Sequence, residues 1–514
     1  MTERANGEIL LGVDAGTSAV KVCAYFRDGH PAAMASRAVR VASPRPGHAE
    51  IDVEDYWSKV VEAVREVASK VGRVAAVGIS ATSPTTIAVD ADGKAIGGGI
   101  VYLDQRSDAI VRERCCDIDD NGRYFVRIGN RPGCSTSWLA NLCWLARHDA
   151  DAWRRVRRVL LLGGYLVSRM TGRATIDWTQ ASYSGGFRVG YPEAGWDRDS
   201  LSFWGVDPDI LPEPGWSCRA AGCLLSDAAS AMGLNAGTAV AFGSADTAAA
   251  AFAMGVREAG DVFESSGTSG VITFCLDRPD FDETFMNRCH VFPGRWLAHG
   301  AMSTFGGAFG WLRGKIWPEI DSPEELERLA SASPPGANGL VFLPYLAGER
   351  SPIWDAEASG IWVGLRLDST RADMVRAVFE GTVFGLRQIF ERGKKRWGYV
   401  PSRLIGVGGG STSRLWSEIK TDVLGVEYVT ADHPAAAAWG AAMMGGVAGG
   451  VFSGTDDPDL TFLGATGRDG QAGSRPRDDN TKRAYERAFA VYERLYPALR
   501  EEMHLLAERE RGEA

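Results

Sequence analysis

The chain has 514 residues, with 56 Lys and Arg against 65 Asp and Glu, and a net charge of −9. This length predicts two to four domains, each large enough to form its own core, and the acidic balance disfavours a nucleic-acid-binding protein. Glycine is in excess, at 62 residues. Because no Gly-X-Y period accompanies it, we expect tight turns and close backbone approaches.

The distribution of apolar residues, cysteines and histidines excludes further classes. No uninterrupted apolar run approaches the roughly 18–20 residues that a membrane span needs. The first apolar run, Ile9–Val13, is too short for a signal peptide. Nine cysteines and seven histidines show no metal-ligand spacing. We therefore expect reduced thiols in a cytoplasmic protein, and no zinc site.

The first half opens with a strand-turn-strand pattern. Apolar residues over 9–13 precede Asp14-Ala15-Gly16-Thr17-Ser18, and a second apolar run follows over 20–26. Further along, apolar residues recur at helical spacing or form continuous buried runs. They predict helices over 55–71, 138–146 and 160–170, and strands over 74–79 and 239–242.

The same pattern returns near the middle of the chain. Residues 262–274 contain Gly267-Thr268-Ser269 between two apolar runs, and the Gly-Thr-Ser core repeats that of Gly16-Thr17-Ser18. This repeat indicates an internal duplication, which predicts two related α/β halves facing across a cleft. The remaining pattern predicts helices over 371–392, 413–424, 435–451 and 482–511, a strand over 403–407 and a loop over 454–480.

The two Gly-Thr-Ser turns are candidate phosphate sites. Glycine allows the backbone to approach an anion closely, and successive N–H and hydroxyl groups bind phosphate oxygens. Asp14 ends the strand before the first turn, where its carboxylate can hold a magnesium ion through water. An ordinary hairpin turn explains one such motif equally well. A matching turn in the other half favours a pair of phosphate-binding hairpins.

Asp246 is the candidate general base. It follows the strand over 239–242 and a Gly-Ser turn, and it precedes a run of small residues that predicts a helix. Sites in α/β folds form at such strand ends. A carboxylate there can accept the proton of a substrate hydroxyl that attacks phosphorus. The alternative is a simple helix cap.

Two glycine-rich junctions complete the set of candidate motifs. Gly408-Gly409-Gly410 and Gly306-Gly307 each stand between a strand and a helix, where a backbone without side chains permits flat contact with a nucleotide. Close helix packing is the alternative reading of both. The chain has neither a GxxxxGK[ST] P-loop nor a GxGxxG motif, which disfavours P-loop enzymes and Rossmann dehydrogenases.

Taken in order, these segments resemble the FGGY family of carbohydrate kinases, within the actin and hexokinase superfamily. The similarity spans nearly the whole chain and rests on six ordered segments. These are "LGVDAGTSAVKVCAYF", "VGISATSPTTIAVDADGKAI" with "IVYLDQRS", "GSADTAAAAFAMG", "SSGTSG", "GERSPIWDAEASGIWVGL" and "GVGGGSTSRLWSEIKTDVLG".

The resemblance implies a fold, a domain division and an activity. The fold would be two ribonuclease-H-like (actin-like ATPase) α/β domains facing across a catalytic cleft. Residues 1–255 would form the sugar-binding domain and residues 256–514 the nucleotide-binding domain. The activity would be transfer of the γ-phosphoryl group of ATP to a hydroxyl of a small sugar, without a nucleic-acid or membrane partner. A homodimer is left open.

The resemblance also assigns roles to individual residues. Asp246 would be the general base, and Asp14 and Asp246 would hold Mg²⁺. The residues assigned to ATP are Gly16, Thr17, Ser18, Gly267, Thr268, Gly307, Gly409, Gly410 and Ser413. The residues assigned to the acceptor sugar are Thr82, Ser83, Pro84, Tyr102, Asp104, Asp246 and Thr247.

The acceptor is less closely specified. Thr82-Ser83-Pro84 replaces both the Gln-Met-His typical of xylulokinases and the Gln-Arg-Glu typical of glycerol kinases, and Tyr102 replaces the Trp of the W-x-D-x-R element. Overall length and the "GERSPIWD" segment look most like xylulokinase-type members. We therefore expect a pentulose such as D-xylulose, with a ribulokinase-like or polyol kinase as the alternative.

A different class of function stays open at this point. The same fold supports ATPases in which the nucleotide drives a conformational switch, and sugar sensors without catalysis. A switch ATPase needs a partner-binding domain, which the residues after 445 do not supply. The presence of both Asp14 and Asp246 favours an enzyme over a sensor, because a sensor does not need the base.

Overall fold

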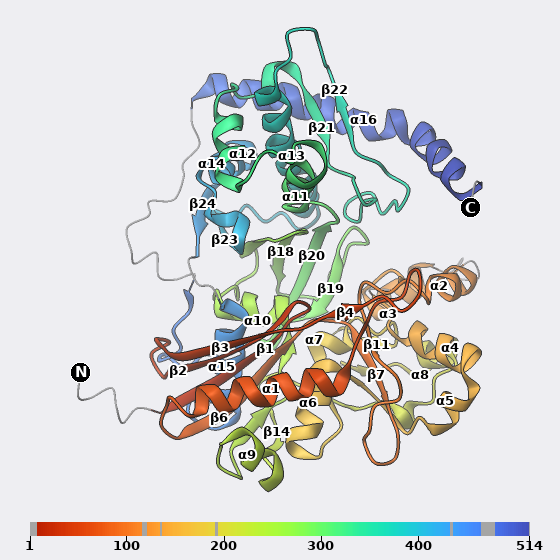
Figure 1. Ribbon diagram of the computed structural model, residues 1–514, viewed down its shortest axis with the longest axis vertical. Helices are drawn as coiled ribbons and strands as arrows, with labels where there is room; N and C mark the ends of the chain where they lie inside the picture. The colour runs from red at the N-terminus through yellow and green to blue at the C-terminus, as the bar shows by residue number, and fades with distance from the viewer. Residues whose placement is uncertain are drawn as a thin grey trace. The chain divides into compact units, whose positions relative to one another are not determined.

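The computed structural model describes residues 8–115, 121–133, 136–190, 194–431, 435–463 and 478–512. The chain divides into two compact units. Unit 1 is drawn from Met1–Arg257, Leu276–Leu297 and Ala435–Ala465, and unit 2 from Glu258–Cys275, Ala298–Pro434 and Thr466–Ala514. Each unit is mixed α/β (Figure 1).

A mixed sheet forms the centre of unit 1, with strand order β14-β15-β6-β1-β2-β3 and β16 paired to β6. β1 pairs antiparallel with β2, and β6 runs parallel to β1, β15 and β16. The strands are β1 (Ile9–Ala15), β2 (Ala19–Phe26), β3 (Pro31–Ala38), β6 (Val74–Ala81), β14 (Ala220–Cys223), β15 (Ala239–Ala241) and β16 (Ser244–Ala245).

Helices cover both faces of this sheet. Odd-numbered residues of β1, such as Leu11 and Val13, share a buried cluster with Val60 and Val64 of α1 (Val53–Ala68). Because side chains alternate along a strand, the even-numbered residues face the other way. There Gly12 lies against α15 (Ala436–Ala448), which Figure 1 shows in blue among the red strands.

A second sheet in unit 1 has the order β4-β5-β8-β7-β9. Its strands are β4 (Val41–Ala42), β5 (Glu50–Ile51), β8 (Gly99–Val101), β7 (Thr85–Val89) and β9 (Arg158–Leu161). Short strands also occur outside the two sheets: β10 (Thr175–Asp177) pairs with β13 (Glu213–Gly215), and β11 (Phe187–Arg188) with β12 (Gly195–Trp196). β19 (Met286–Cys289) also belongs to the residues of unit 1.

Nine further described helices belong to the residues of unit 1. They are α2 (Asp108–Cys115), α3 (Asn121–Ile128), α4 (Leu139–His148), α5 (Ala150–Arg155), α6 (Leu162–Thr171), α7 (Trp178–Ala181), α8 (Arg198–Trp204), α9 (Ser226–Met232) and α10 (Asp246–Ala253).

Unit 2 repeats the strand pattern of unit 1. Its sheet runs β20-β18-β17-β23-β24, with an antiparallel β17–β18 hairpin and β23 parallel to both β17 and β24. The strands are β17 (Val262–Ser266), β18 (Gly270–Leu276), β20 (Trp296–Met302), β23 (Arg403–Val407) and β24 (Glu427–Thr430). In each unit, the strand before the Gly-Thr-Ser turn therefore lies between its hairpin partner and a parallel strand.

Unit 2 also contains a long capped helix, α13 (Arg371–Trp397). Thr370 and Asp373 form a reciprocal capping box at its start, and Gly398, with φ of 72°, ends it. The remaining elements are β21 (Val341–Leu343), β22 (Ile361–Val363), α11 (Gly307–Trp311), α12 (Pro323–Ser331), α14 (Arg414–Leu424) and α16 (Asp479–Gly512).

Most predicted elements are confirmed, and the differences lie at their ends. The strand over 403–407 has the predicted bounds, whereas the apolar run over 160–170 is divided between β9 and α6. The division arises because Leu160 and Leu161 pair with β7, which the run's own periodicity does not reveal. Residues 464–477 of the predicted 454–480 loop lie outside the described residues.

Among the helices of the described residues, none is both long and apolar enough to cross a membrane.

The contact of α15 with the sheet leads to a stability prediction. A Cβ added at Gly78 would lie 1.7 Å from the carbonyl oxygen of Ala441, and one added at Gly12 would lie 1.9 Å from that of Ala438. Since both obstacles are backbone, relief requires α15 to move away from the sheet. We expect Gly78→Ala to lower the free energy of unfolding by about 3 kcal/mol or more, measured by urea denaturation.

Gly72→Ala is the matched control, because an added Cβ there meets nothing within 4 Å. Equal stability of the two variants would contradict the close packing of α15 on β6.

Candidate functional site

Three parallel strands of unit 1 end at the same edge of its sheet. Asp14 of β1 pairs with Ser80 of β6, and Ser244 of β16 pairs with the same Ser80 from the other side. Asp246 follows Ser244 by two residues. The carboxyl ends of parallel strands are where α/β folds place their sites, and this register brings Asp14 and Asp246 to that edge.

Hydrogen bonds join the first Gly-Thr-Ser turn to the end of β6. The hydroxyls of Thr17 and Thr82 lie 3.0 Å apart, and the backbone N–H of Thr82 donates to Ala15 at 2.9 Å. The hydroxyl of Tyr56 donates to the carbonyl of Gly16 at 2.9 Å. These contacts fix the turn that contains Gly16, Thr17 and Ser18, and they place Thr82 next to it.

Asp246 begins α10 but does not cap it. The N-cap position belongs to Ala245. The Oδ1 atom of Asp246 accepts hydrogen bonds from the backbone N–H of Thr247 at 2.6 Å and from its hydroxyl at 3.1 Å. Both donors reach the same oxygen, so Thr247 orients the carboxylate.

The two carboxylates of this edge are partly desolvated and interact. Loss of water raises the pKa of Asp14 to about 6, with a further contribution from the negative charge of Asp246. Desolvation also raises the pKa of Asp246, whereas the positive charge of Arg288 opposes that rise. Two carboxylates in this state attract protons or a cation more strongly than carboxylates in water do.

The other residues predicted to bind the acceptor have mixed environments. Thr82 and Pro84 are buried, and Ser83 is partly exposed. Tyr102 is 37% exposed, and Asp104 is buried. The carboxylate of Asp104 accepts from the Arg106 guanidinium and from the backbone of Ala49. Asp104 therefore fixes this loop, and its contact with the acceptor stays a prediction.

A cavity of about 570 Å³ in unit 2 gathers five of the residues predicted to bind ATP. Two glycine-rich segments face it from different elements: the turn after β17 and the segment after β23. The residues concerned are Gly267, Thr268, Gly409, Gly410 and Ser413.

The predicted Gly307 lies just behind the second hairpin. The backbone N–H groups of Gly306 and Gly307 donate to the carbonyls of Gly267 and Thr268, both at 3.0 Å. A Cβ at Gly306 would meet the Gly267 oxygen at 2.4 Å, so only glycine permits this contact. Ser413 caps α14 and donates to Glu327 at 2.8 Å.

A buried ion pair beneath this hairpin escaped prediction. The side chains of Lys420 and Glu264 are fully buried, with Nζ 3.0 Å from Oε2. Nζ also donates to the hydroxyls of Ser266 at 2.6 Å and Tyr428 at 3.0 Å. Since Ser266 lines the cavity, the pair fixes one of its walls. A lysine in an amphipathic helix is ordinarily solvent-exposed, so no local pattern predicts this buried pair.

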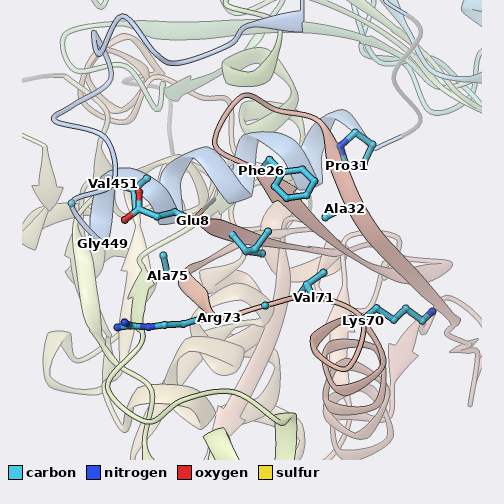
Figure 2. A pocket seen from close by; sticks show the side chains of 13 residues that line it. Glu8, Phe26, Pro31, Ala32, Lys70, Val71, Arg73, Ala75, Gly449 and Val451 are labelled. Carbon is cyan, nitrogen blue, oxygen red and sulfur yellow. The ribbon is translucent and has the colours of Figure 1, made fainter. Parts of the chain in front are cut away.

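A larger cavity, of about 780 Å³, lies away from the predicted site residues of unit 1. Figure 2 shows its lining from the start of β1, the end of β2 and the segments after α1 and α15. Ile9 at the amino end of β1 lines it, whereas Asp14 stands toward the other end of that strand. Its labelled charged side chains, Glu8, Lys70 and Arg73, do not join the predicted site.

Comparison with known proteins gives the family. The family model for the FGGY carbohydrate kinase N-terminal domain matches residues 9–253, and that for the C-terminal domain matches residues 262–449. The chain therefore belongs to the FGGY family of carbohydrate kinases. It is a carbohydrate kinase. This result favours the enzyme over the switch ATPase and the sugar sensor.

Individual relatives differ in their sugars. A xylulose kinase of Staphylococcus epidermidis is 28% identical over 495 residues, covering 95% of this chain and 96% of that protein. A gluconokinase of Bacillus subtilis is 23% identical, covering 98% of each. The solved structure of the xylulose kinase from Rhodospirillum rubrum is 27% identical, with a TM-score of 0.88, covering 97% of this chain and all of that one.

The raised pKa of Asp14 leads to a prediction on stability against pH. Because the folded state binds this proton more tightly than the unfolded chain, stability falls as the pH rises from about 4 through about 6. The loss at Asp14 amounts to roughly 2–3 kcal/mol. We expect Asp14→Asn to remove it, so that the variant without ligands is more stable than wild type at pH 7.5.

Urea unfolding at pH 4.5 and 7.5 measures this effect, with Asp92→Asn in an exposed turn as the control. The assignment fails if Asp14→Asn keeps the pH dependence of the wild type.

The Lys420–Glu264 pair leads to a second prediction. Lys420→Met leaves the Glu264 carboxylate buried without its partner, which costs about 3–5 kcal/mol in free energy of unfolding. Replacing both residues by apolar side chains removes the uncompensated charge. The double variant Glu264→Leu, Lys420→Met should therefore be more stable than Lys420→Met alone.

Lys59→Met is the control, since Lys59 pairs with Asp55 at the surface of α1. Such a pair contributes about 0–1 kcal/mol. A Lys420→Met variant no less stable than Lys59→Met would contradict the structural role of the buried pair.

Proposed function

We propose that the protein transfers the γ-phosphoryl group of ATP to a hydroxyl of a small sugar, with a pentulose such as D-xylulose as the favoured acceptor and Asp246 as the general base. The observation that carries the proposal is the meeting of Asp14, Thr82 and Asp246 at one edge of the unit 1 sheet. Phosphoryl transfer requires mainly positioning and charge compensation, and this edge offers oxygen ligands for both.

Asp246 takes the proton of the attacking hydroxyl. Its raised pKa makes the ionised carboxylate a stronger base than an aspartate in water. Thr247 holds Oδ1 with two hydrogen bonds, which leaves Oδ2 to accept from the acceptor sugar. As the sugar oxygen attacks phosphorus, the proton moves to this carboxylate and ADP leaves.

The residues of this edge fit a magnesium ion. Magnesium prefers hard oxygen ligands and keeps several of its waters. Asp14 and Asp246 supply carboxylates whose mutual repulsion a divalent cation would offset, and Ser80 donates to Asp14 at 3.3 Å. Asp14 and Asp246 would hold the ion, directly or through water. When bound, it neutralises charge on the phosphates.

Both Gly-Thr-Ser turns serve the nucleotide in this proposal. Gly16, Thr17 and Ser18 present N–H and hydroxyl groups suited to the γ-phosphate, and Gly267 and Thr268 do the same for the β- and γ-phosphates. The flat backbone of Gly409 and Gly410 and the capping residue Ser413 suit the remainder of ATP, in the cavity of about 570 Å³.

D-Xylulose is favoured because xylulose kinases are the more similar relatives, at up to 28% identity. Gluconate is the second candidate, because the gluconokinase of Bacillus subtilis matches over 98% of both chains. Thr82, Ser83 and Pro84 are the residues expected to separate these acceptors. A ribulokinase-like or polyol kinase activity belongs to the same acceptor panel.

The proposal predicts the effect of Asp246→Asn. Removing the base should lower kcat about 10²- to 10⁴-fold while ATP still binds. The measurement is ADP release in a coupled assay with D-xylulose, D-gluconate, D-ribulose and glycerol, together with ATP binding by calorimetry.

Asp227→Asn provides the control, since Asp227 is an exposed aspartate in the first turn of α9, as Asp246 is in that of α10. Near-complete activity of Asp246→Asn would reject the base assignment.

A further inference from the structure

Arg288 is a buried arginine, two of whose side-chain nitrogens have no hydrogen-bond partner among the described residues. It lies in β19 and is 3% exposed. Its Nε and Nη1 atoms are enclosed and have no hydrogen-bond partner among the described residues. The guanidinium lies over the ring of Tyr183, 3.9 Å from its centroid. That contact satisfies the face of the guanidinium but not its N–H groups.

Arg376 is a buried arginine with a structural role, and it serves as a comparison for Arg288. Arg376 in α13 is also 3% exposed. It donates to Glu380 at 2.7 Å and to Tyr485 at 2.6 Å. A buried donor without an acceptor destabilises the folded protein, and a charged one does so more strongly. Burying the Nε and Nη1 atoms of Arg288 without acceptors therefore carries a cost.

The backbone on both sides of Arg288 is fixed. The N–H of Asn287 donates to Asn130 at 2.7 Å, and the N–H of Cys289 donates to Ser182 at 3.0 Å. Side chains alternate along a strand, so the Arg288 side chain leaves β19 on the face opposite those of Asn287 and Cys289. The backbone that carries Arg288 is thus held on both sides, and the ring of Tyr183 packs against the guanidinium.

This guanidinium belongs to the surroundings of Asp246. Helix α7 contacts both β19, which carries Arg288, and β16, which leads into Asp246. The hydroxyl of Thr179 in α7 accepts from the backbone N–H of Ala245 at 2.7 Å and donates to Asp177 at 2.5 Å. Desolvation raises the pKa of both Asp246 and Asp177, and the positive charge of Arg288 opposes that rise.

We propose that Arg288 is an acceptor-binding residue, whose guanidinium donates to oxygen atoms of the sugar that Asp246 deprotonates. The inference rests on the proposed function, because that function places the acceptor at Asp246. The oxygens are those of a hydroxyl, carbonyl or carboxylate group, and charge-assisted hydrogen bonds from a guanidinium are strong with all three. Arg288 thereby adds a specificity residue to Thr82, Ser83 and Pro84.

The test compares Arg288→Met, Arg288→Lys and the control Arg376→Met. We expect Arg288→Met to raise the acceptor KM about 10- to 100-fold, with the KM for ATP unchanged within two-fold. The acceptors are D-xylulose, D-gluconate, and whichever member of the panel wild type phosphorylates best. Arg288→Lys keeps the charge, so its KM for the acceptor should lie between that of wild type and that of Arg288→Met.

Thermal unfolding separates a binding role of Arg288 from a structural one, because loss of a structural arginine lowers the melting temperature. Arg288→Met removes unpaired buried donors, and the carboxylates of Asp246 and Asp177 keep their hydrogen bonds from neighbouring residues. Its melting temperature without ligands should therefore equal or exceed that of wild type. Arg376→Met should melt lower, since it leaves Glu380 without its cation. Adding the acceptor should raise the melting temperature of wild type more than that of Arg288→Met.

The outcomes separate the inference from the proposed function. An increase in KM confined to D-gluconate supports it with a carboxylate as the ligand, and an increase for D-xylulose supports it with neutral oxygens. An unchanged acceptor KM together with a melting temperature as low as that of Arg376→Met overturns it. If Asp246→Asn retains activity, the proposed function fails instead, whatever Arg288→Met shows.

Discussion

The parallel alignment of β1, β6 and β16 is the constraint on which the site of unit 1 depends. Ser80 of β6 is the common partner of Asp14 on one side and Ser244 on the other. A shift of one residue in either pairing would turn a carboxylate toward the opposite face of the sheet. The close approach of α15 to Gly12 and Gly78 holds this sheet in place, so the glycine excess serves the site indirectly.

The same principle operates in unit 2 with different chemistry. The second Gly-Thr-Ser turn follows β17, and its backbone is bound by Gly306 and Gly307. Beneath it, Lys420 and Glu264 form a fully buried ion pair at a position that apolar side chains could also fill. A buried pair of this kind contributes little net stability. Both members of the pair instead bind the hydroxyl of Ser266 at the wall of the cavity: it accepts from Lys420 and donates to Glu264.

Local sequence patterns predicted much of the fold and the segments that carry the main candidate site residues. The strand-turn-strand units, the helix over 371–392 and the segment leading into Asp246 each carry a signal within a few residues. The partners that complete the site come from distant segments and carry no such signal. Lys420 lies 156 residues from Glu264. Arg288 interacts with Asp246 through its charge, and no motif in the sequence links the two residues.

Paired and unpaired buried charges mark different roles in this molecule. Lys420 and Arg376 are surrounded by acceptors, so their burial is complete without a ligand. Arg288 has a fixed backbone and an aromatic platform, yet two of its enclosed nitrogens lack acceptors among the described residues. Where another molecule supplies the acceptors, binding offsets the cost of burying these nitrogens. In the function proposed above, an oxygen-rich acceptor beside Asp246 would supply those hydrogen-bond acceptors.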